Sequence, residues 1–244
     1  MIKLIVMDLD GTLLPYGATS LSDETKALLR CLRAQGKTLA FSSGRTYEEL
    51  TPYVSEWKDD AYLMGCEGAY TVYQDKNIYE RKIELEDLIR FFRQESCSFV
   101  MHGGRSSFGY GELPPEAAYF SPLPIQRIGD IQEKVFKVTT FGPPLRLPPL
   151  SGLRIQWDGG KRGMMQYVNR FANKGTALSD LQMRLMISGF ETVCLGDSEN
   201  DVPMMRNAKM TYCVGDRCPQ LSRICNHHVA TVEEALRQLT ELEK

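Results

Sequence analysis

The sequence lacks the features that mark several large classes of protein. Its charge is balanced, since 29 Lys and Arg stand against 31 Asp and Glu for a net charge of -2. That balance is not typical of a basic nucleic-acid binder or of an acidic disordered chain. We find no internal repeat and no low-complexity tract. We therefore expect a globular protein with no nucleic-acid partner.

Long apolar runs are missing as well. The apolar opening from Met1 to Met7 is interrupted by Asp8 and Asp10. This interruption comes too early for the core of a signal peptide or for a membrane span. We expect a cytoplasmic protein with no membrane partner.

The cysteines have no metal-ligand spacing. Their number, seven, is odd, and no Cys-x-x-Cys or Cys/His pattern typical of zinc sites occurs. Most lie within apolar runs, so we expect reduced thiols packed in the interior. The set comprises Cys31, Cys66, Cys97, Cys194, Cys213, Cys218 and Cys225.

Short apolar runs alternate with helical patterns at both ends of the chain. Strands are expected near residues 3–7, 37–41 and 61–64, with a helix at 47–57 before the third. Another helix should begin after Ser22. This alternation is typical of a parallel sheet that helices cover on both faces.

The helix after Ser22 has Asp23 and Glu24 in its first turn and should stop at Gly36. We expect its buried face to contain Leu28, Cys31 and Leu32. The alternation then resumes near Lys174 with a further helix. Beyond it we expect strands at 192–195 and 209–214, a short helix at 219–225 and a last helix after Thr231.

The middle of the chain differs in composition and is rich in Gly and Pro. One helix and four strands are expected there, at 84–95, 98–101, 135–141, 154–157 and 164–168. The segment from Pro143 to Pro149 should be a loop or a chain crossing, because each proline removes an amide donor. We predict an α/β fold, with a Rossmann-like parallel-sheet core at 1–81 and 166–244 and a smaller α+β domain inserted at 82–165.

Two carboxylates follow the first strand. Asp8 and Asp10 lie two residues apart, so on an extended chain they point the same way and repel each other. A divalent cation, or protonation of one carboxylate, would relieve the repulsion and prepare the pair for catalysis. Gly11 permits a sharp turn and Thr12 adds a hydroxyl. The alternative is an ordinary acidic turn.

Three further polar clusters occur along the chain. Residues 42–45 follow the second strand and offer hydroxyls and amides to an anion, although a plain turn is the alternative. Lys174 lies in a first helical turn, where a cation opposes the helix dipole unless an anion is near; a solvated lysine is the alternative. Residues 196–201 are rich in oxygen ligands suited to Mg²⁺, or form an acidic surface turn.

Sites in open parallel sheets form outside the carboxyl ends of the strands, where all four clusters lie. Here the chain resembles the haloacid dehalogenase superfamily, and in particular its Cof-like phosphatases with a class IIB cap inserted after the third core strand. The resemblance rests on four motifs in order, Asp8-Leu-Asp-Gly-Thr-Leu-Leu14, Ser42-Ser-Gly-Arg45, Lys174-Gly-Thr-Ala-Leu178 and Gly196-Asp-Ser-Glu-Asn-Asp-Val-Pro-Met204.

The resemblance implies an aspartyl-phosphate mechanism. Asp8 would be the nucleophile, and Asp10 the acid that protonates the leaving oxygen and later activates water. Mg²⁺ would be held by Asp8, the backbone carbonyl of Asp10 and Asp197, with Asp201 orienting the metal-side loop. The residues expected to contact the phosphate are Leu9, through its amide, Thr12, Ser43, Lys174 and Asn200.

The resemblance therefore implies a hydrolase of small phosphorylated metabolites, with sugar phosphates as the leading expectation. A phosphotransferase or mutase with the same intermediate, or an idle regulatory module that keeps the fold, are the alternatives. The chain departs from the family at Glu67, where an amide is usual. Expected candidates for reading the leaving group are the polar residues of the insert, His102, Arg105, Arg154, Lys161 and Arg162.

Overall fold

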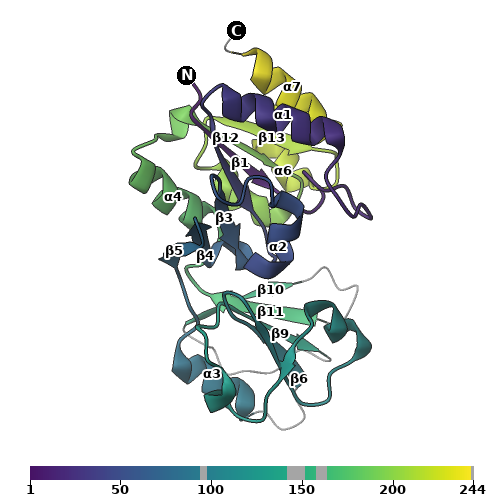
Figure 1. The fold of residues 1–244 in the computed structure, drawn as a ribbon, viewed down its shortest axis with the longest axis vertical. Coiled ribbons are helices and arrows are strands. Elements are labelled where there is room, and N and C mark those ends of the chain that lie inside the picture. Colours follow the sequence, from purple (N-terminus) through teal and green to yellow (C-terminus); the bar gives the residue numbers. More distant parts are fainter. Residues whose placement is uncertain (94–97, 142–151, 158–163, 243–244) are drawn as a thin grey trace.

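The computed structural model (Figure 1) describes residues 1–93, 98–141, 152–157 and 164–242. In these residues the strands form two sheets, one of eight strands and one of six. Both chain termini lie beyond the larger sheet, at the end of the molecule opposite the smaller sheet. None of the helices described is long and apolar enough to cross a membrane.

The larger sheet has the order β14-β13-β12-β1-β2-β3-β4-β5. Its strands from β14 to β3 are parallel, whereas β4 and β5 are antiparallel to their neighbours. The predicted α/β fold with a parallel-sheet core is therefore confirmed. The strands are β1 (Leu4–Asp8), β2 (Thr38–Ser42), β3 (Tyr62–Gly65), β4 (Tyr70–Tyr73), β5 (Lys76–Glu80), β12 (Thr192–Gly196), β13 (Met210–Val214) and β14 (His227–Val229).

The hairpin of β4 and β5 was not among the predicted elements, and neither was the short strand β14. Gln74 and Asp75 form the turn of this hairpin with φ angles of 50° and 59°. Such left-handed pairs suit the tight turns that match strand twist, but Asn-Gly or Asp-Gly is their usual signal. The sequence Gln-Asp therefore gave no clear hairpin pattern.

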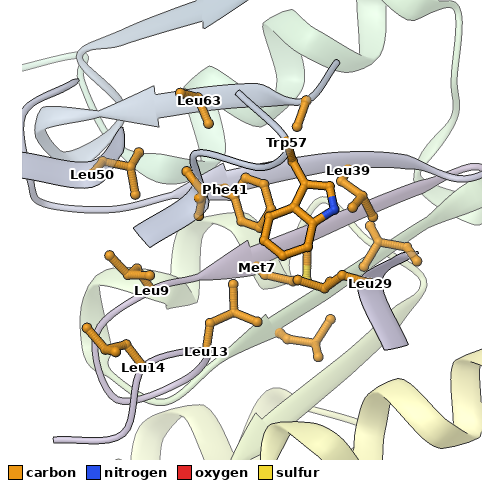
Figure 2. Close-up of a cluster of buried hydrophobic side chains, with 14 of the residues drawn as sticks. Met7, Leu9, Leu13, Leu14, Leu29, Leu39, Phe41, Leu50, Trp57 and Leu63 are labelled. Atoms are coloured by element: carbon orange, nitrogen blue, oxygen red, sulfur yellow. The ribbon is translucent and has the colours of Figure 1, made fainter. Parts of the chain in front are cut away.

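Helices cover both faces of the larger sheet. In β1, Ile5 and Met7 point into one apolar cluster and Leu4 and Val6 into the other. The first cluster, part of which is drawn in Figure 2 around Trp57, includes side chains of α1 (Asp23–Ala34), α2 (Tyr47–Val54) and α7 (Val232–Glu241). The second includes α4 (Lys174–Leu185), α5 (Val202–Met205) and α6 (Pro219–Ile224). This double covering explains the nearly continuous apolar character of the strands.

The predicted buried face of α1 was wrong in part. Thr25, Leu29 and Leu32 are buried, which follows the spacing of one helix stripe, whereas Cys31 is exposed. The expectation that every cysteine packs in the interior therefore fails for Cys31. Cys97 lies outside the described residues. The remaining five are buried free thiols: Cys66, Cys194, Cys213, Cys218 and Cys225.

The smaller sheet has the order β10-β11-β9-β6-β7-β8. Helix α3 (Leu85–Phe92) covers one face, where Phe91 packs edge-on against Phe99 and Tyr167. The predicted loop of 143–149 lies outside the described residues, and β7 and β8 were not predicted. The strands are β6 (Ser98–His102), β7 (Ser107–Tyr110), β8 (Leu123–Pro124), β9 (Lys137–Phe141), β10 (Leu153–Trp157) and β11 (Met164–Asn169).

Five short 3-10 helices complete the described structure. They are η1 (Cys66–Gly68), η2 (Pro115–Phe120), η3 (Ile128–Asp130), η4 (Gly189–Glu191) and η5 (Glu199–Asp201). Two of them matter for function, because η1 follows the end of β3 and η5 follows the end of β12. Both therefore begin at the edge of the larger sheet where the predicted motifs meet.

Candidate active site

The predicted motifs converge at the carboxyl ends of the central strands. Asp8 ends β1 and lies in register with Ser42, the last residue of β2. On the other side of β1, strand β12 ends at Gly196, so that Asp197 begins the next loop at the same edge. Parallel pairing thus brings together segments almost 190 residues apart.

Lys174 links two of these segments. Its Nζ lies 2.5 Å from Asp8 Oδ1 and 2.7 Å from Asp201 Oδ1, and the lysine is only 1% exposed. The preceding residue, Asn173, caps α4 by accepting the amide of Thr176 at 2.9 Å. The anion that a cation in a first helical turn requires is therefore present, in the form of two carboxylates.

Three buried carboxylates crowd this position. One oxygen from each of Asp8, Asp197 and Asp201 lies within 4.8 Å of the others. Burial raises the pKa of Asp8 well above its usual value, and the charges of Asp201 and Asp197 add to this effect against the attraction of Lys174. Burial and Asp201 also raise the pKa of Asp197. One lysine does not neutralise the cluster.

The negative charge that Lys174 leaves uncompensated in this cluster lies on Asp8 and Asp197. Asp201 is fully engaged, because Oδ1 meets Lys174 and Oδ2 accepts the amides of Asp197 and Ser198 at 3.1 and 3.0 Å. By contrast, the buried Oδ2 of Asp8 has no hydrogen-bond partner in the described part of the chain. Hard carboxylate oxygens of this kind suit a divalent cation. The residues present therefore fit a bound metal ion.

Asp197 is oriented by two hydroxyls. Thr12 Oγ1 donates to Asp197 Oδ1 at 3.2 Å, and the Tyr16 hydroxyl donates to Oδ2 at 3.0 Å. Burial and the charge of Asp197 raise the pKa of Tyr16 to about 12, so the phenol stays a donor. Thr12, predicted as a phosphate contact, here holds the carboxylate. Tyr16 was not predicted, and Arg217 stacks on its ring at 4.2 Å.

Asp10 is held beside the cleft by Arg45. The guanidinium donates from Nη2 at 2.7 Å and from Nε at 2.9 Å to the two carboxylate oxygens, while Ser43 Oγ lies 3.4 Å from Oδ2. Arg45 also stacks on the ring of Tyr53. This pairing fixes the Asp10 side chain, which stays partly exposed. The Ser-Gly-Arg motif was predicted to matter for its hydroxyl, and the ion pair was not foreseen.

Glu67 lies between two of the motifs. It has a left-handed backbone, with φ 61°, and its Oε2 accepts a hydrogen bond from the side-chain Nδ2 of Asn200 at 3.1 Å. A Cβ on Gly44 would come within 2.2 Å of Glu67 Oε1, so the glycine leaves the space that the carboxylate occupies. Asn200, predicted to contact phosphate, is thereby tied to Glu67.

A cleft of about 890 Å³ opens over these groups. Asp8, Asp10 and Asn200 line it from the larger sheet, while Ser43 and Lys174 are buried beneath it. The side chain of Leu9 belongs to the apolar core, so only its backbone remains for the predicted phosphate contact. Residues of η2 and of the smaller sheet also line the cleft: Tyr119 and Phe120 from η2, Lys137 from β9, and Met164 and Gln166 from β11.

The insert residues expected to read the leaving group are placed differently. His102 is fully buried, with Nδ1 3.0 Å from Ser107 Oγ and Nε2 2.8 Å from Thr139 Oγ1, so it does not face the cleft. Arg105 stacks on Tyr47, away from the lining residues. Arg154 donates to the Ala172 carbonyl at 2.8 Å and does not line the cleft either.

Lys161 and Arg162 lie outside the described residues.

Lys137, which does line the cleft, was not predicted. It opens β9 within an apolar stretch, where the sequence shows only a strand. A charged residue in such a strand is a signal that could have singled it out, since buried charges are uncommon without a role.

The family model for haloacid dehalogenase-like hydrolases matches residues 5–141 and 146–235. Among curated relatives, an HMP-PP phosphatase of Klebsiella pneumoniae is 25% identical over 259 residues, which cover 93% of this chain and 89% of the relative. A 5-amino-6-(5-phospho-D-ribitylamino)uracil phosphatase of Bacillus subtilis is 24% identical over 222 residues, covering 88% and 84%.

Solved structures agree in fold. A haloacid dehalogenase-like hydrolase from Bacteroides thetaiotaomicron has a TM-score of 0.84 and 20% identity, covering 98% of this chain and 100% of its own. A subclass IIB sugar phosphatase of the superfamily has a TM-score of 0.80 and 17% identity, covering 97% and 98%. These matches confirm the predicted resemblance and enzyme class, a phosphoric monoester hydrolase: the chain belongs to the haloacid dehalogenase-like hydrolase family.

Proposed function

We propose that this hydrolase is a Mg²⁺-dependent phosphatase of small phosphorylated metabolites that forms an aspartyl-phosphate on Asp8. The observation that carries the proposal is the state of the Asp8 carboxylate. Lys174 holds one oxygen, while the other is buried, has no partner in the described residues and belongs to a residue that lines the cleft. An oriented carboxylate with one available oxygen is suited to attack phosphorus.

In the proposed first step, an oxygen of Asp8 bonds to phosphorus and the bond between phosphorus and the leaving oxygen breaks. Asp10 donates a proton to that oxygen, which departs as an alcohol. Asp10 lines the cleft, and it would carry this proton once its carboxyl group has left the Arg45 guanidinium that holds it in the structure. The leaving group needs this proton because an alkoxide is a poor leaving group.

In the second step, Asp10 takes a proton from water as the water attacks phosphorus. The bond between phosphorus and Asp8 breaks, inorganic phosphate forms and the Asp8 carboxylate is restored. Lys174 and Ser43 would bind the phosphoryl oxygens in both steps. Asp8, the Asp10 carbonyl and Asp197 would hold Mg²⁺, which when bound neutralises charge on the transferring group.

The insert, residues 82–165, is proposed to act as the cap. Its residues form one wall of the cleft, so they are placed to contact whatever part of the substrate extends from the phosphate. The curated relatives named above are phosphatases of HMP-PP and of 5-amino-6-(5-phospho-D-ribitylamino)uracil, which supports a small phosphorylated metabolite as substrate. A closed cap would also exclude bulk water.

The proposal is tested by trapping the intermediate. Asp10→Asn should slow the second step, so acid-quenched protein incubated with Mg²⁺ and p-nitrophenyl phosphate, whose leaving group needs no proton, should gain the mass of one phosphoryl group. Peptide mapping should place that group on Asp8, and the Asp8→Asn,Asp10→Asn double variant is the matched control. A screen of phosphorylated metabolites for phosphate release by the wild-type protein tests the substrate class. Turnover without any labelled Asp8 would overturn the covalent mechanism.

A further inference from the structure

The wall of the cleft near Gly44 combines an acceptor and a donor that the proposed phosphate site does not use. Glu67 is only 5% exposed, yet it lines the cleft. Lys137 is 3% exposed and also lines the cleft, and its Nζ donates to the Gly44 carbonyl at 2.7 Å. The two residues come from η1 and β9 and flank the same glycine.

Lys137 has spare hydrogen-bonding capacity. An ammonium has three N–H donors, and the described residues provide one acceptor for it, the Gly44 carbonyl. No carboxylate pairs with Lys137 in the described part of the chain. A buried ammonium without an anionic partner is costly unless something else satisfies it. A bound ligand at the cleft is placed to do so.

Glu67 offers the complementary group. Its Oε2 accepts one bond, from Asn200, and an ionised carboxylate accepts several. A carboxylate beside a phosphate site repels further anionic groups of a ligand and can accept hydrogen bonds from its neutral donors. A hydroxyl can donate a hydrogen bond to Glu67 and accept one from Lys137. Adjacent hydroxyls can engage both side chains at once.

An aromatic pair forms the facing part of the insert wall. Tyr119 and Phe120 line the cleft, and their rings contact each other at 5.2 Å between centroids. His102 packs edge-on behind Phe120 at 4.8 Å, so this ring is supported from the interior of the insert. Aromatic faces suit the C–H surface of a sugar or polyol and do not suit a second anionic group.

We infer that Glu67 and Lys137 form a specificity site for a polyhydroxylated leaving group, and that Tyr119 and Phe120 pack against its carbon chain. The inference rests on the proposed function, because it assigns the alcohol that the phosphatase releases. It names the residues that recognise the alcohol and the chemical class they require. Recognition of hydroxyls at buried polar groups is selective, because an analogue without them leaves those groups unpaired.

The test compares two phosphates with the same number of carbons, ribitol phosphate and pentyl phosphate. Binding is measured by calorimetry with Mg²⁺ on Asp8→Asn protein, which cannot turn either over. Ribitol phosphate should bind about tenfold more tightly or better, since each hydrogen bond to a charged group contributes to affinity. Glu67→Gln and Lys137→Met, each added to this protein, should remove most of that preference. Thermal unfolding verifies that each variant is folded.

Two control variants remove the same charges elsewhere. Glu199→Gln changes an exposed carboxylate that does not line the cleft. Arg217→Met removes a cation that lines the cleft and stacks on the ring of Tyr16. Both should keep the preference for ribitol phosphate. Glu67→Gln keeps an acceptor for Asn200, so a loss of preference in that variant reports the carboxylate and not a displaced loop.

Equal affinity for the two phosphates, or a preference that neither Glu67→Gln nor Lys137→Met reduces, overturns the inference. Tighter binding of a phosphorylated sugar acid than of ribitol phosphate also overturns it, because Lys137 would then serve an anion. Turnover by the wild-type protein separates the two proposals. Hydrolysis of both phosphates without selective binding refutes only the specificity site, while selective binding without phosphate release supports the site and refutes the phosphatase chemistry.

Discussion

The ammonium of Lys174 lies 2.5 Å from Oδ1 of Asp8, although 166 residues separate the two in the sequence. Both are buried, and the same ammonium also meets Asp201. The lysine therefore fixes one oxygen of Asp8 and leaves the other available at the cleft. The predictions below depend on this asymmetry and on the charge around it.

Replacing Asp8 by Asn should abolish turnover and leave the fold intact. The amide has nearly the same shape as the carboxylate, but it is a poor nucleophile. We expect kcat to fall by more than about a thousandfold. Phosphate release and circular dichroism measure the two effects. Activity near that of the wild type would remove Asp8 from the nucleophile role.

Removal of divalent cations should abolish activity, and Mg²⁺ should restore it. The buried carboxylates of Asp8 and Asp197 would otherwise repel each other and the phosphate of the substrate. Mg²⁺ should also raise the midpoint of thermal unfolding, because it binds the folded protein alone. Asp197→Asn should weaken both responses. Full activity in chelator would contradict the metal assignment.

Replacing Asp10 by Asn should slow the poorest leaving groups most. An alkyl phosphate needs a proton on its leaving oxygen in the transition state, whereas nitrophenolate leaves without one. We expect a loss of about 10²- to 10⁴-fold for the alkyl ester when formation of the aspartyl-phosphate is followed in single turnovers. Equal slowing of both esters in that measurement would exclude the acid role.

The metal-free protein should lose stability as the pH rises above about 4. Burial raises the folded-state pKa values of Asp8 and Asp197 above their unfolded values, so the folded state holds protons that the unfolded chain releases. The free energy of unfolding therefore falls as the pH rises from about 4 through the folded-state pKa values of Asp8 and Asp197. Urea titrations in chelator measure it. Asp8→Asn should show a shallower fall, and a slope equal to that of the wild type would contradict the reasoning.

Replacing His102 by Ala should destabilise the protein without changing leaving-group preference. Burial lowers the pKa of His102 well below its usual value, so the ring is neutral and bonds to Ser107 and Thr139. Loss of the ring leaves a cavity and two unpaired hydroxyls, at a cost of about 3 kcal/mol. Urea unfolding measures the loss. An altered ratio of kcat/KM for ribitol phosphate and pentyl phosphate, with unchanged stability, would restore His102 as a specificity residue.

The sequence determined the layout of the core. Short apolar runs alternating with amphipathic helices predict a parallel sheet, and polar motifs at successive strand ends must then meet at one edge. This reasoning located Asp8, Ser43, Lys174 and Asp197, because each follows a strand or begins a helix by rules that act over a few residues. Local patterns were sufficient where local chemistry sets the structure.

The tertiary structure alone decided which side chains share an environment. Nothing near Tyr16, Glu67 or Lys137 in the sequence shows that one orients Asp197 and that the other two flank Gly44. Helix α1, which contains Cys31, could likewise be predicted from the sequence, but the side chains that it buries could not. The sheet on which the helix packs decides which of its faces is buried. Contacts between distant segments depend on the registers and packing of whole sheets, and single-sequence periodicity carries no information about them.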